Sequence, residues 1–313
     1  MDRLQGIETF VRVAQCSSFA EAARQLRVSR SVVTTRVQQL EEYLGGPLFH
    51  RTTRSVRLSE LGQAFLRDCS DLIGRASDIM DQMRDVRGSP SGMLRIHALP
   101  GFVLGHLAKV LRDFQAEYPG IQLDLVVSDT VVDPVKAGFD CALQIFGPAS
   151  EELIARELFS VQRIFCASPR YLAEHGMPLH PGDLLSHRLG LYSNYPTRDK
   201  WVFSRGDQQT ALDLKAALLT NSVHLLAEYA QEHAGIVCLP TLVASAPICQ
   251  GALQWVLKDY ALSAFPFSVV YPRSLKQSYK LRLFLESLTV RFKGSLPWDL
   301  ALGLGPPAPR AKG

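Results

Sequence analysis

The sequence predicts an α/β protein whose N-terminal part is helical and whose larger C-terminal part is a sheet covered by helices. Three observations predict this organisation. Apolar residues recur at steps of three and four over residues 4–44, a seam with the same spacing follows over residues 59–87, and short apolar runs alternate with helical patterns from residue 92 onward. With 313 residues, the chain is long enough for two or three domains.

The first 46 residues predict three helices. The first covers residues 4–14, and the second begins where Ser18 and Glu21 have the spacing of a capping box. Ser29 is a suitable N-cap for the third helix, and the glycine pair at 45–46 is suited to end it. Because only the short stretch "RVS" separates the second helix from the third, the two form a helix-turn-helix.

The stretch "PLFHRTTRSVRLS" predicts a two-stranded hairpin that carries Arg51, Arg54 and Arg57. Residues 1–58 contain nine arginines, no lysine and five acidic residues, so this segment accounts for the whole net charge of +4. An excess of arginine confined to one small segment favours a nucleic-acid partner, because neutralisation of phosphates drives such binding. Charge alone leaves a solvated basic surface as an alternative.

A long helix is predicted over residues 59–87, since its apolar seam extends for about four heptads, or about 43 Å at 1.5 Å per residue. The seam consists of Leu61, Phe65, Cys69, Leu72, Ala76, Ile79, Met83 and Val86. Such a helix suits pairing with a second helix, and packing against its own chain is the alternative. The stretch "RGSPSG" at 87–92 reads as a linker.

From residue 92 the alternation of strands and helices indicates a parallel sheet with helices on its faces. The Pro/Gly-rich C-terminus predicts a disordered tail. No apolar run reaches the length of about 18 to 20 residues that a membrane span needs, and the N-terminus lacks the core of a secretory signal. We therefore expect a cytoplasmic protein.

Catalytic and metal-binding motifs are not apparent. The sequence has no G-x-S-x-G elbow, and the glycines at 303 and 305 are followed by prolines that prevent a dinucleotide-binding helix. His224 and Glu228 have helical spacing, but no third ligand lies close in sequence. The six scattered cysteines are expected to be reduced core residues, with a redox pair as the alternative. We expect no cofactor and no catalysis.

Two stretches carry a family resemblance: "SFAEAARQLRVSRSVVTTRVQQLEEYLGGPLFHRTTRSVRLSELGQAFL" and "FCASPRYLAEHGMPLHPGDLLSHR". With them, residues 1 to about 293 resemble a LysR-type transcriptional regulator. The resemblance implies a winged helix-turn-helix, a dimerising linker helix and a two-lobed effector domain similar to periplasmic binding proteins. The implied parts are 1–58, 59–91, 92–293 (lobe I 92–160 and 266–293, lobe II 161–265) and a disordered tail over 294–313.

The resemblance also implies the partners: double-stranded DNA with inverted-repeat half-sites, a small-molecule effector, and further copies of the chain in a homodimer or tetramer. In a helix-turn-helix the second helix enters the major groove. The predicted DNA contacts are Ser29, Arg30, Ser31, Thr34, Thr35, Arg36, Arg51, Thr52, Thr53 and Arg54. We expect Arg30 to read a guanine, Thr34, Thr35 and Arg36 to bind phosphates, and the wing arginines to lie along the DNA backbone or in a minor groove.

Effectors of a two-lobed domain bind beyond the carboxyl ends of the strands. The predicted effector-binding residues are Leu99, Pro100, Gly101, Phe102, Ser128, Asp129, Gln144, Phe146, Asn194, Asn221, Ser222 and Phe265. Similar regulators often carry Arg-Ile-Gly where this chain has residues 144–146, so the loss of that arginine favours a small aromatic or largely apolar effector over a carboxylate.

Two further departures concern DNA. The family often has Gln where Arg30 stands and Arg where Thr35 stands, so the operator is expected to differ from the family's usual one. The competing class is a solute-binding module or an enzyme built on the same two lobes. Neither would use an arginine-rich head, and a solute-binding module would need export, which no signal in the sequence directs.

Overall fold

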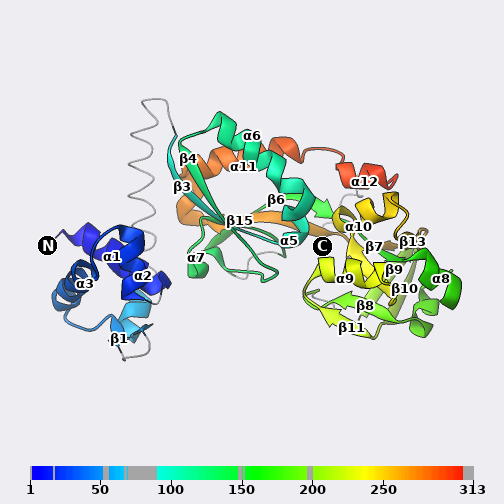
Figure 1. The fold of residues 1–313 in the computed structure, drawn as a ribbon, viewed down its shortest axis with the longest axis horizontal. Coiled ribbons are helices and arrows are strands. Elements are labelled where there is room, and N and C mark those ends of the chain that lie inside the picture. Colours follow the sequence, from blue (N-terminus) through cyan, green and yellow to red (C-terminus); the bar gives the residue numbers. More distant parts are fainter. Residues whose placement is uncertain are drawn as a thin grey trace.

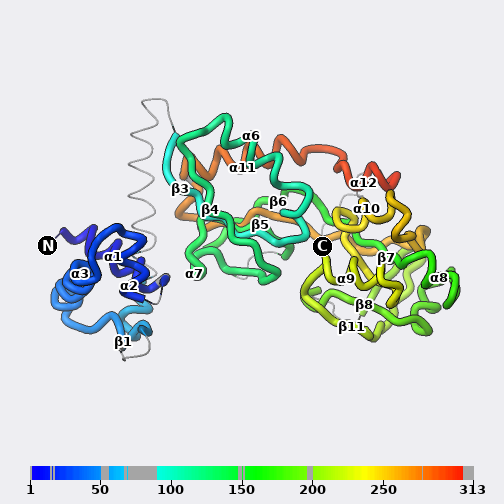
Figure 2. Tube along the Cα trace, viewed as in Figure 1, coloured from blue at the N-terminus to red at the C-terminus, as the bar shows by residue number. Residues whose placement is uncertain are grey.

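The structure is a computed structural model of the chain and describes residues 2–16, 18–51, 56–66, 69, 90–146, 150, 152–195 and 200–305. A small helical domain, the head (residues 2–58), is followed along the chain by two α/β lobes, which Figure 1 shows as ribbons and Figure 2 as a continuous tube. The fold class predicted from the sequence is confirmed. No described helix is both long and apolar enough to cross a membrane.

The head has three helices, α1 (Arg3–Cys16), α2 (Phe19–Leu26) and α3 (Arg30–Leu44). The Ser18 hydroxyl accepts a bond from the Glu21 backbone N–H at 3.3 Å, but the Glu21 carboxylate pairs with Arg24, so the described bonds give one half of the predicted capping box. Ser29 caps α3 as predicted. Gly45 ends α3 in the left-handed conformation with φ 75°, which a glycine adopts without the Cβ penalty.

The wing is the antiparallel pair β1 (Phe49–Arg51) and β2 (Val56–Leu58), in agreement with the predicted hairpin. Its buried base connects to the linker helix, which is described from residue 60 to 66 and at Cys69. Ser59 caps that helix, because its hydroxyl accepts the Gly62 N–H at 2.9 Å and donates to the Pro47 carbonyl at 2.5 Å. The rest of the predicted seam lies outside the described residues.

Lobe I contains a five-stranded sheet in the order β4-β3-β5-β15-β6. Helices α6 and α11 lie side by side over this sheet (Figure 1). Its elements are β3 (Gly92–Ala98), α5 (Pro100–Phe102), the kinked turn η1 (Val103–Leu107), α6 (Ala108–Glu117), β4 (Ile121–Val127), α7 (Pro134–Ala137), β5 (Cys141–Ile145), β6 (Leu153–Val161), β15 (Phe265–Pro272), η3 (Arg273–Gln277) and α11 (Tyr279–Arg291).

Lobe II contains a five-stranded sheet, β11-β8-β12-β7-β13, and a three-stranded sheet, β10-β9-β14. The chain enters this lobe after β6 and returns to lobe I at β15. Its elements are β7 (Arg163–Ala167), α8 (Pro169–His175), η2 (Pro181–Ser186), β8 (Leu189–Tyr192), β9 (Lys200–Arg205), β10 (Gln208–Asp213), β11 (Leu218–Thr220), α9 (Val223–Gln231), β12 (Ile236–Pro240), α10 (Thr241–Cys249), β13 (Gln254–Val256) and β14 (Ala261–Leu262).

Two sequence predictions about this domain are wrong. The sheets are mixed and not purely parallel, because β15 returns antiparallel to β5 and β6 while β7 is antiparallel to β12 and β13. The predicted disorder from residue 294 is also wrong as far as residue 305. Residues 294–305 include α12 (Pro297–Ala301), whose Trp298 is 3% exposed. Residues 306–313 lie outside the described part of the chain.

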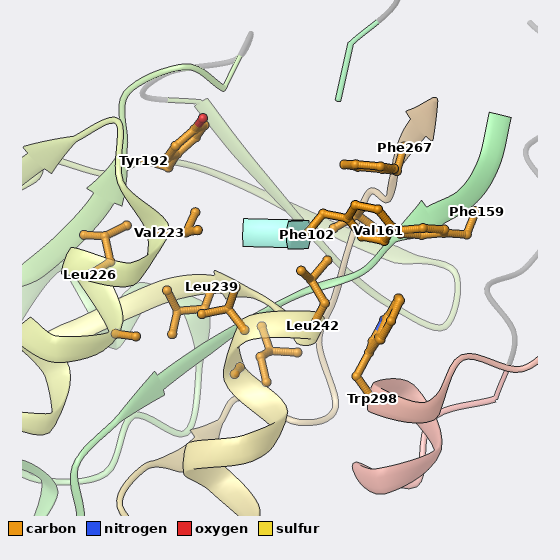
Figure 3. Packing of buried hydrophobic residues seen from close by; sticks show 14 of the residues in the cluster. Phe102, Phe159, Val161, Tyr192, Val223, Leu226, Leu239, Leu242, Phe267 and Trp298 are labelled. Carbon is orange, nitrogen blue, oxygen red and sulfur yellow. The ribbon is translucent and has the colours of Figure 1, made fainter. Parts of the chain in front are cut away.

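Buried side chains form two separate hydrophobic clusters. One fills the head, and the other extends through both lobes. In the second cluster, the rings of Phe102, Phe159 and Phe267 lie against one another, with centroids 4.6 Å apart for Phe102 and Phe267 and 5.0 Å apart for Phe159 and Phe267. Figure 3 shows these rings beside Trp298, and the cluster continues through Leu242 towards lobe II. The junction between the lobes is therefore an apolar core.

Candidate functional site

The recognition face of the head is the exposed side of α3. Val33, Val37 and Leu40 are buried against the other helices, so the opposite side of α3 faces solvent. Ser29, Arg30, Ser31 and Thr35 are exposed there, and Thr34 and Arg36 are half-buried. The sequence-predicted residues of the helix therefore lie together around its first two turns.

Hydrogen bonds fix the start of α3. The Ser29 hydroxyl accepts the Val32 N–H at 3.3 Å and lies 2.8 Å from the Ser31 hydroxyl. Thr34 donates its hydroxyl proton to the Arg30 carbonyl at 3.0 Å, which leaves its oxygen lone pairs as acceptors. The Arg30 side chain is exposed and has no described hydrogen-bond or ion-pair partner, so its guanidinium is available to donate to a base or a phosphate.

Sequence analysis missed Gln38 and Gln39, which are exposed on α3. Gln38 follows Thr34 and Thr35 by four and three residues, the spacing that places side chains on one face, and that spacing was the available signal. On the wing, His50 and Arg57 are paired in register across the two strands, and both are exposed. Thr52, Thr53, Arg54 and the side chain of Arg51 lie outside the described residues.

The wing and the linker helix are fixed to α3 by close contacts. The Glu41 carboxylate accepts the N–H groups of Leu48 and Phe49 at 2.8 and 3.2 Å. Gly62 lies so close to the wing that a Cβ atom at this position would be 2.1 Å from the Leu48 carbonyl oxygen. A rotation of the linker helix would therefore carry the wing with it.

A cavity of about 50 Å³ lies between the two lobes. Figure 3 shows Tyr192 and Val223 of lobe II on one side and Phe102, Val161 and Phe267 of lobe I on the other. The lining residues are Leu99, Gly101, Phe102, Asp129, Ile145, Val161, Arg163, Tyr192, Tyr195, Val223, Pro240, Leu242, Phe265 and Phe267. All but a few of these side chains are apolar, so the cavity favours a ligand with an apolar body.

A wider hollow of about 600 Å³, the mouth, adjoins this cavity. It is lined by Asp129, Thr130, Val131, Phe146, Ser193, Asn194, Tyr195 and Asn221, so it shares Asp129 and Tyr195 with the cavity. The Asn194 amide donates across the mouth to the backbone carbonyl of Asp129 at 3.4 Å, which joins the lobes at this edge. Burial raises the pKa of Asp129, while the nearby His224 lowers it.

Phe146 has an unusual backbone at the mouth, with φ 73°. A non-glycine residue in this left-handed region costs about 1 kcal/mol or more. The ring of Phe146 contacts that of Phe265 edge-on, with centroids 5.4 Å apart. A bulky ring thus stands at the entrance in this chain.

The structure brings some predicted effector residues to the cleft and not others. Leu99, Gly101, Phe102, Asp129 and Phe265 line the cavity, and Phe146, Asn194 and Asn221 line the mouth with Asp129.

Four predicted residues line neither space. Pro100 begins α5, and the Ser128 hydroxyl is 2.8 Å from Nε2 of His97. Gln144 is 2% exposed and uses its amide to bind both the N–H and the carbonyl of Val132. Ser222 caps α9. Position at a strand end therefore selected supporting residues together with lining ones.

Arg163 is the main cavity residue that sequence analysis missed. It is the first residue of β7, and the available signal was a charge at the head of the apolar run "RIFCA". Its side chain is 8% exposed, and one nitrogen, Nη2, donates to the Ser263 carbonyl at 2.9 Å. The other two, Nε and Nη1, have no hydrogen-bond partner in the part of the chain that the structure describes.

Metal and redox chemistry receive no support from the described residues. Over the ranges given above, no three His, Cys, Asp or Glu side chains come together as a metal site. Cys166 and Cys238 are buried, and burial raises the pKa of both, that of Cys238 to about 12. These two residues therefore remain protonated thiols at neutral pH.

The head, with its exposed recognition helix and wing, and the two lobes, with a cavity between them, define a DNA-binding regulator that carries a small-molecule cleft. Residues 4–63 match the helix-turn-helix of bacterial regulatory proteins of the lysR family, and residues 87–293 match the LysR substrate binding domain. The chain belongs to the LysR family of transcriptional regulators.

Two transcriptional regulators are similar to this chain over nearly their whole length. The HTH-type transcriptional regulator PtxR of Pseudomonas aeruginosa is 30% identical over 300 residues, which cover 95% of each chain. The HTH-type transcriptional activator AaeR of Escherichia coli is 29% identical over 292 residues, covering 93% of this chain and 94% of that protein.

Solved structures show the same architecture. The LysR-type transcriptional regulator CrgA from Neisseria meningitidis aligns with a TM-score of 0.60 at 29% identity, covering 93% of this chain and 99% of CrgA. The full-length virulence activator AphB of Vibrio cholerae aligns with a TM-score of 0.59 at 25% identity, covering 91% of this chain and 98% of AphB. The function of this chain is thus effector-modulated, DNA-binding transcription regulation.

Proposed function

We propose that this chain reads an inverted-repeat operator as a homodimer or tetramer, with α3 in the major groove and the wing on the backbone. The observation that carries the proposal is the exposed face of α3, where Arg30, Ser31 and Thr35 stand opposite a fully buried stripe. Arg30 offers the forked donor that recognises guanine. The wing arginines and Arg57 supply sequence-independent contacts to phosphate.

The cavity between the lobes is proposed as the effector site, with a binding role and no catalysis. Because Gly62 and Glu41 fix the linker helix to the head, movement of the lobes would change the separation of two heads in a dimer. Half-site spacing is geometric, so an effector is expected to alter the footprint or the bend of the DNA more than the overall affinity. We infer a cytoplasmic location from the DNA partner.

The test of DNA reading compares Arg30→Ala with Arg57→Ala in gel-shift titrations on the operator and on random DNA. Arg30→Ala should cost about 1 to 3 kcal/mol on the operator and little on random DNA, whereas Arg57→Ala should weaken both alike. The dependence on salt should be steep for the wild type, with each neutralised phosphate adding about −0.9 to the slope of log K against log salt. Equal losses on both DNAs for Arg30→Ala, or a flat dependence on salt, would contradict the assignment.

A second experiment tests the cleft. Ile145→Phe adds volume inside the cavity, far from the head in sequence. We expect this variant to bind DNA as the wild type does and to show no change of footprint with effector. Loss of DNA binding, or an unaltered response, would refute the cleft assignment.

A further inference from the structure

The strongest unexplained feature of the cleft is Arg163, a residue 8% exposed whose side-chain atoms Nε and Nη1 have no hydrogen-bond partner among the described residues. Arginine stays protonated even when buried, so this charge cannot be removed by a shifted pKa. No described carboxylate forms an ion pair with it, and its Nη2 donates to the carbonyl of Ser263 at 2.9 Å. Aromatic faces supply the remaining stabilisation, from Phe265 at 4.2 Å, Tyr195 at 4.5 Å and Trp201 at 5.3 Å from the guanidinium carbon.

Buried charges in proteins are normally paired, and leaving hydrogen-bond donors of a charged group unmade costs free energy. We propose that Arg163 binds the carboxylate of the effector, and that the effector is a small monocarboxylate with an apolar body that extends from the cavity into the mouth. This inference rests on the proposed function, the cavity between the lobes as the effector site. It keeps the largely apolar effector that the sequence suggested and adds the carboxylate that the missing arginine at position 144 had made less favoured.

The donors of Arg163 suit a carboxylate. Nη2 carries two hydrogens and gives one of them to Ser263, so one complete fork of parallel donors remains whichever hydrogen is used. Two parallel bonds from a guanidinium to a carboxylate are charge-assisted and stronger than bonds between neutral groups.

The rest of the cavity limits the ligand to one negative charge. Arg163 is the sole basic residue among the lining residues, and Asp129 is the sole carboxylate among them. A phosphate dianion would leave one charge uncompensated among Leu99, Phe102 and Leu242, which is unfavourable at low dielectric. Asp129, at the entrance, would repel a second carboxylate and accept a hydrogen bond from a hydroxyl or amine at the far end of the ligand.

Arg163 also lies where the lobes are joined. It is the first residue of β7, two residues after β6 ends at Val161, and its partner Ser263 lies in the returning connection, two residues before β15 begins. A ligand charge placed on Arg163 therefore acts on both connections between the lobes. Binding is thereby coupled to the angle between the lobes more directly than contacts on either wall alone would allow.

The test uses the full-length protein at pH 7.5 and measures binding by calorimetry and by thermal shift. The probes are sodium benzoate, phenylacetate and hexanoate, each matched with its uncharged amide, and sodium phosphate and sodium chloride serve as ionic controls. The variants are Arg163→Met and Arg163→Lys, with Arg170→Met as a matched control, since Arg170 is an exposed arginine of the same lobe.

At least one carboxylate is expected to bind, and its amide at least about 10-fold more weakly. Arg163→Met should weaken that carboxylate by about 10- to 100-fold, Arg163→Lys should retain part of the preference over the amide, and Arg170→Met should change neither. Without ligand, Arg163→Met should melt at or above the wild-type temperature, because a buried unpaired charge is removed.

Several results would overturn the proposal. The proposal is wrong if none of the three carboxylates binds, or if a carboxylate and its amide bind equally. It is also wrong if Arg163→Met retains the preference for carboxylate, or if phosphate binds and no carboxylate does. Should Arg163→Met not fold, a preference for carboxylate over amide in Arg163→Lys as large as that of the wild type would count against the proposal. If an amide binds as well as its carboxylate and Ile145→Phe abolishes that binding, the cleft remains the effector site and only the carboxylate proposal is refuted. If the wild type does not bind the operator, the proposed role of the head is refuted and the carboxylate proposal is unaffected.

Discussion

Replacing Trp298 by alanine tests whether the C-terminal helix α12 is part of the effector domain. Trp298 is 3% exposed and its ring lies 4.5 Å from that of His106, 5.3 Å from Phe159 and 6.1 Å from Phe292, measured between centroids. Helix α12 also packs against α10 of lobe II. It therefore contacts both lobes, although it lies beyond the family match that ends at residue 293.

The expected cost follows from burial. Truncating a fully buried tryptophan to alanine removes its transfer free energy and leaves a cavity, for a total of about 3 to 5 kcal/mol. In a domain of this size each kcal/mol moves the melting temperature by about 2 to 4 °C, so we expect Trp298→Ala to lower it by about 6 to 20 °C. The control is Leu300→Ala, because Leu300 is on the same helix and is 58% exposed.

The assay is thermal unfolding of the full-length protein followed by circular dichroism, with urea titration to obtain the free energy of unfolding. Leu300→Ala should stay within about 0.5 kcal/mol of wild type. A loss below about 1 kcal/mol in Trp298→Ala, or equal losses in both variants, would show that α12 does not stabilise the lobes. DNA binding at a temperature below both transitions should be unchanged.

Two further predictions concern the linker and the histidines. Gly62→Ala should destabilise the head by more than 1 kcal/mol and weaken DNA binding, because its methyl group would collide with the Leu48 carbonyl. The control, Gln63→Ala, should change neither property. Melting curves and gel shifts measure both properties, and equal behaviour of the two variants would contradict the prediction. Burial lowers the pKa of His97 below its ordinary 6.5. Below pH 6.5 the unfolded chain therefore binds a proton at His97 that the folded chain does not bind. The free energy of unfolding falls by up to about 1.4 kcal/mol per pH unit as the pH drops from 6.5 to the folded-state pKa. His97→Gln should therefore lose less stability than wild type between pH 7.5 and pH 5.5 in urea titrations, and parallel losses would show that this site does not titrate as described.

Local chemistry made the head predictable. Ser29 and Gly45 have the conformations expected of an N-cap and a C-terminal glycine, and the apolar spacing gave the three helices, because these depend on neighbours within a few residues in the chain. The direction of β15 was not predictable in the same way. A returning strand reads as any other apolar run, and only the second crossing between the lobes makes it antiparallel.

The position of the cleft could be predicted from the sequence, but the residues that line it could be predicted only in part. Strand ends gave Asp129 and Phe265, whereas Gln144 is turned into the loop that follows β4, a distinction between two faces of one strand end that needs the tertiary structure. Arg163 was missed because its importance depends on the lack of hydrogen-bond partners for Nε and Nη1 among the described residues, which the sequence does not reveal. Helix α12 was missed because "GLGPPAPRAKG" dominates the composition of the C-terminus and concealed the short apolar turn around Trp298.

The positive charge of the head comes from arginine alone, and the first lysine of the chain is Lys109, in α6. Lysine acetylation therefore has no target in the recognition helix or the wing, and amine-reactive dyes and cross-linkers modify the lobes while leaving the side chains of the DNA-binding surface intact. A protease that cuts after lysine leaves the head and the linker helix in one fragment. Because guanidinium groups hold their charge at every physiological pH, these arginines give the head a constant affinity for phosphate, and its control is left to the geometry that the lobes impose.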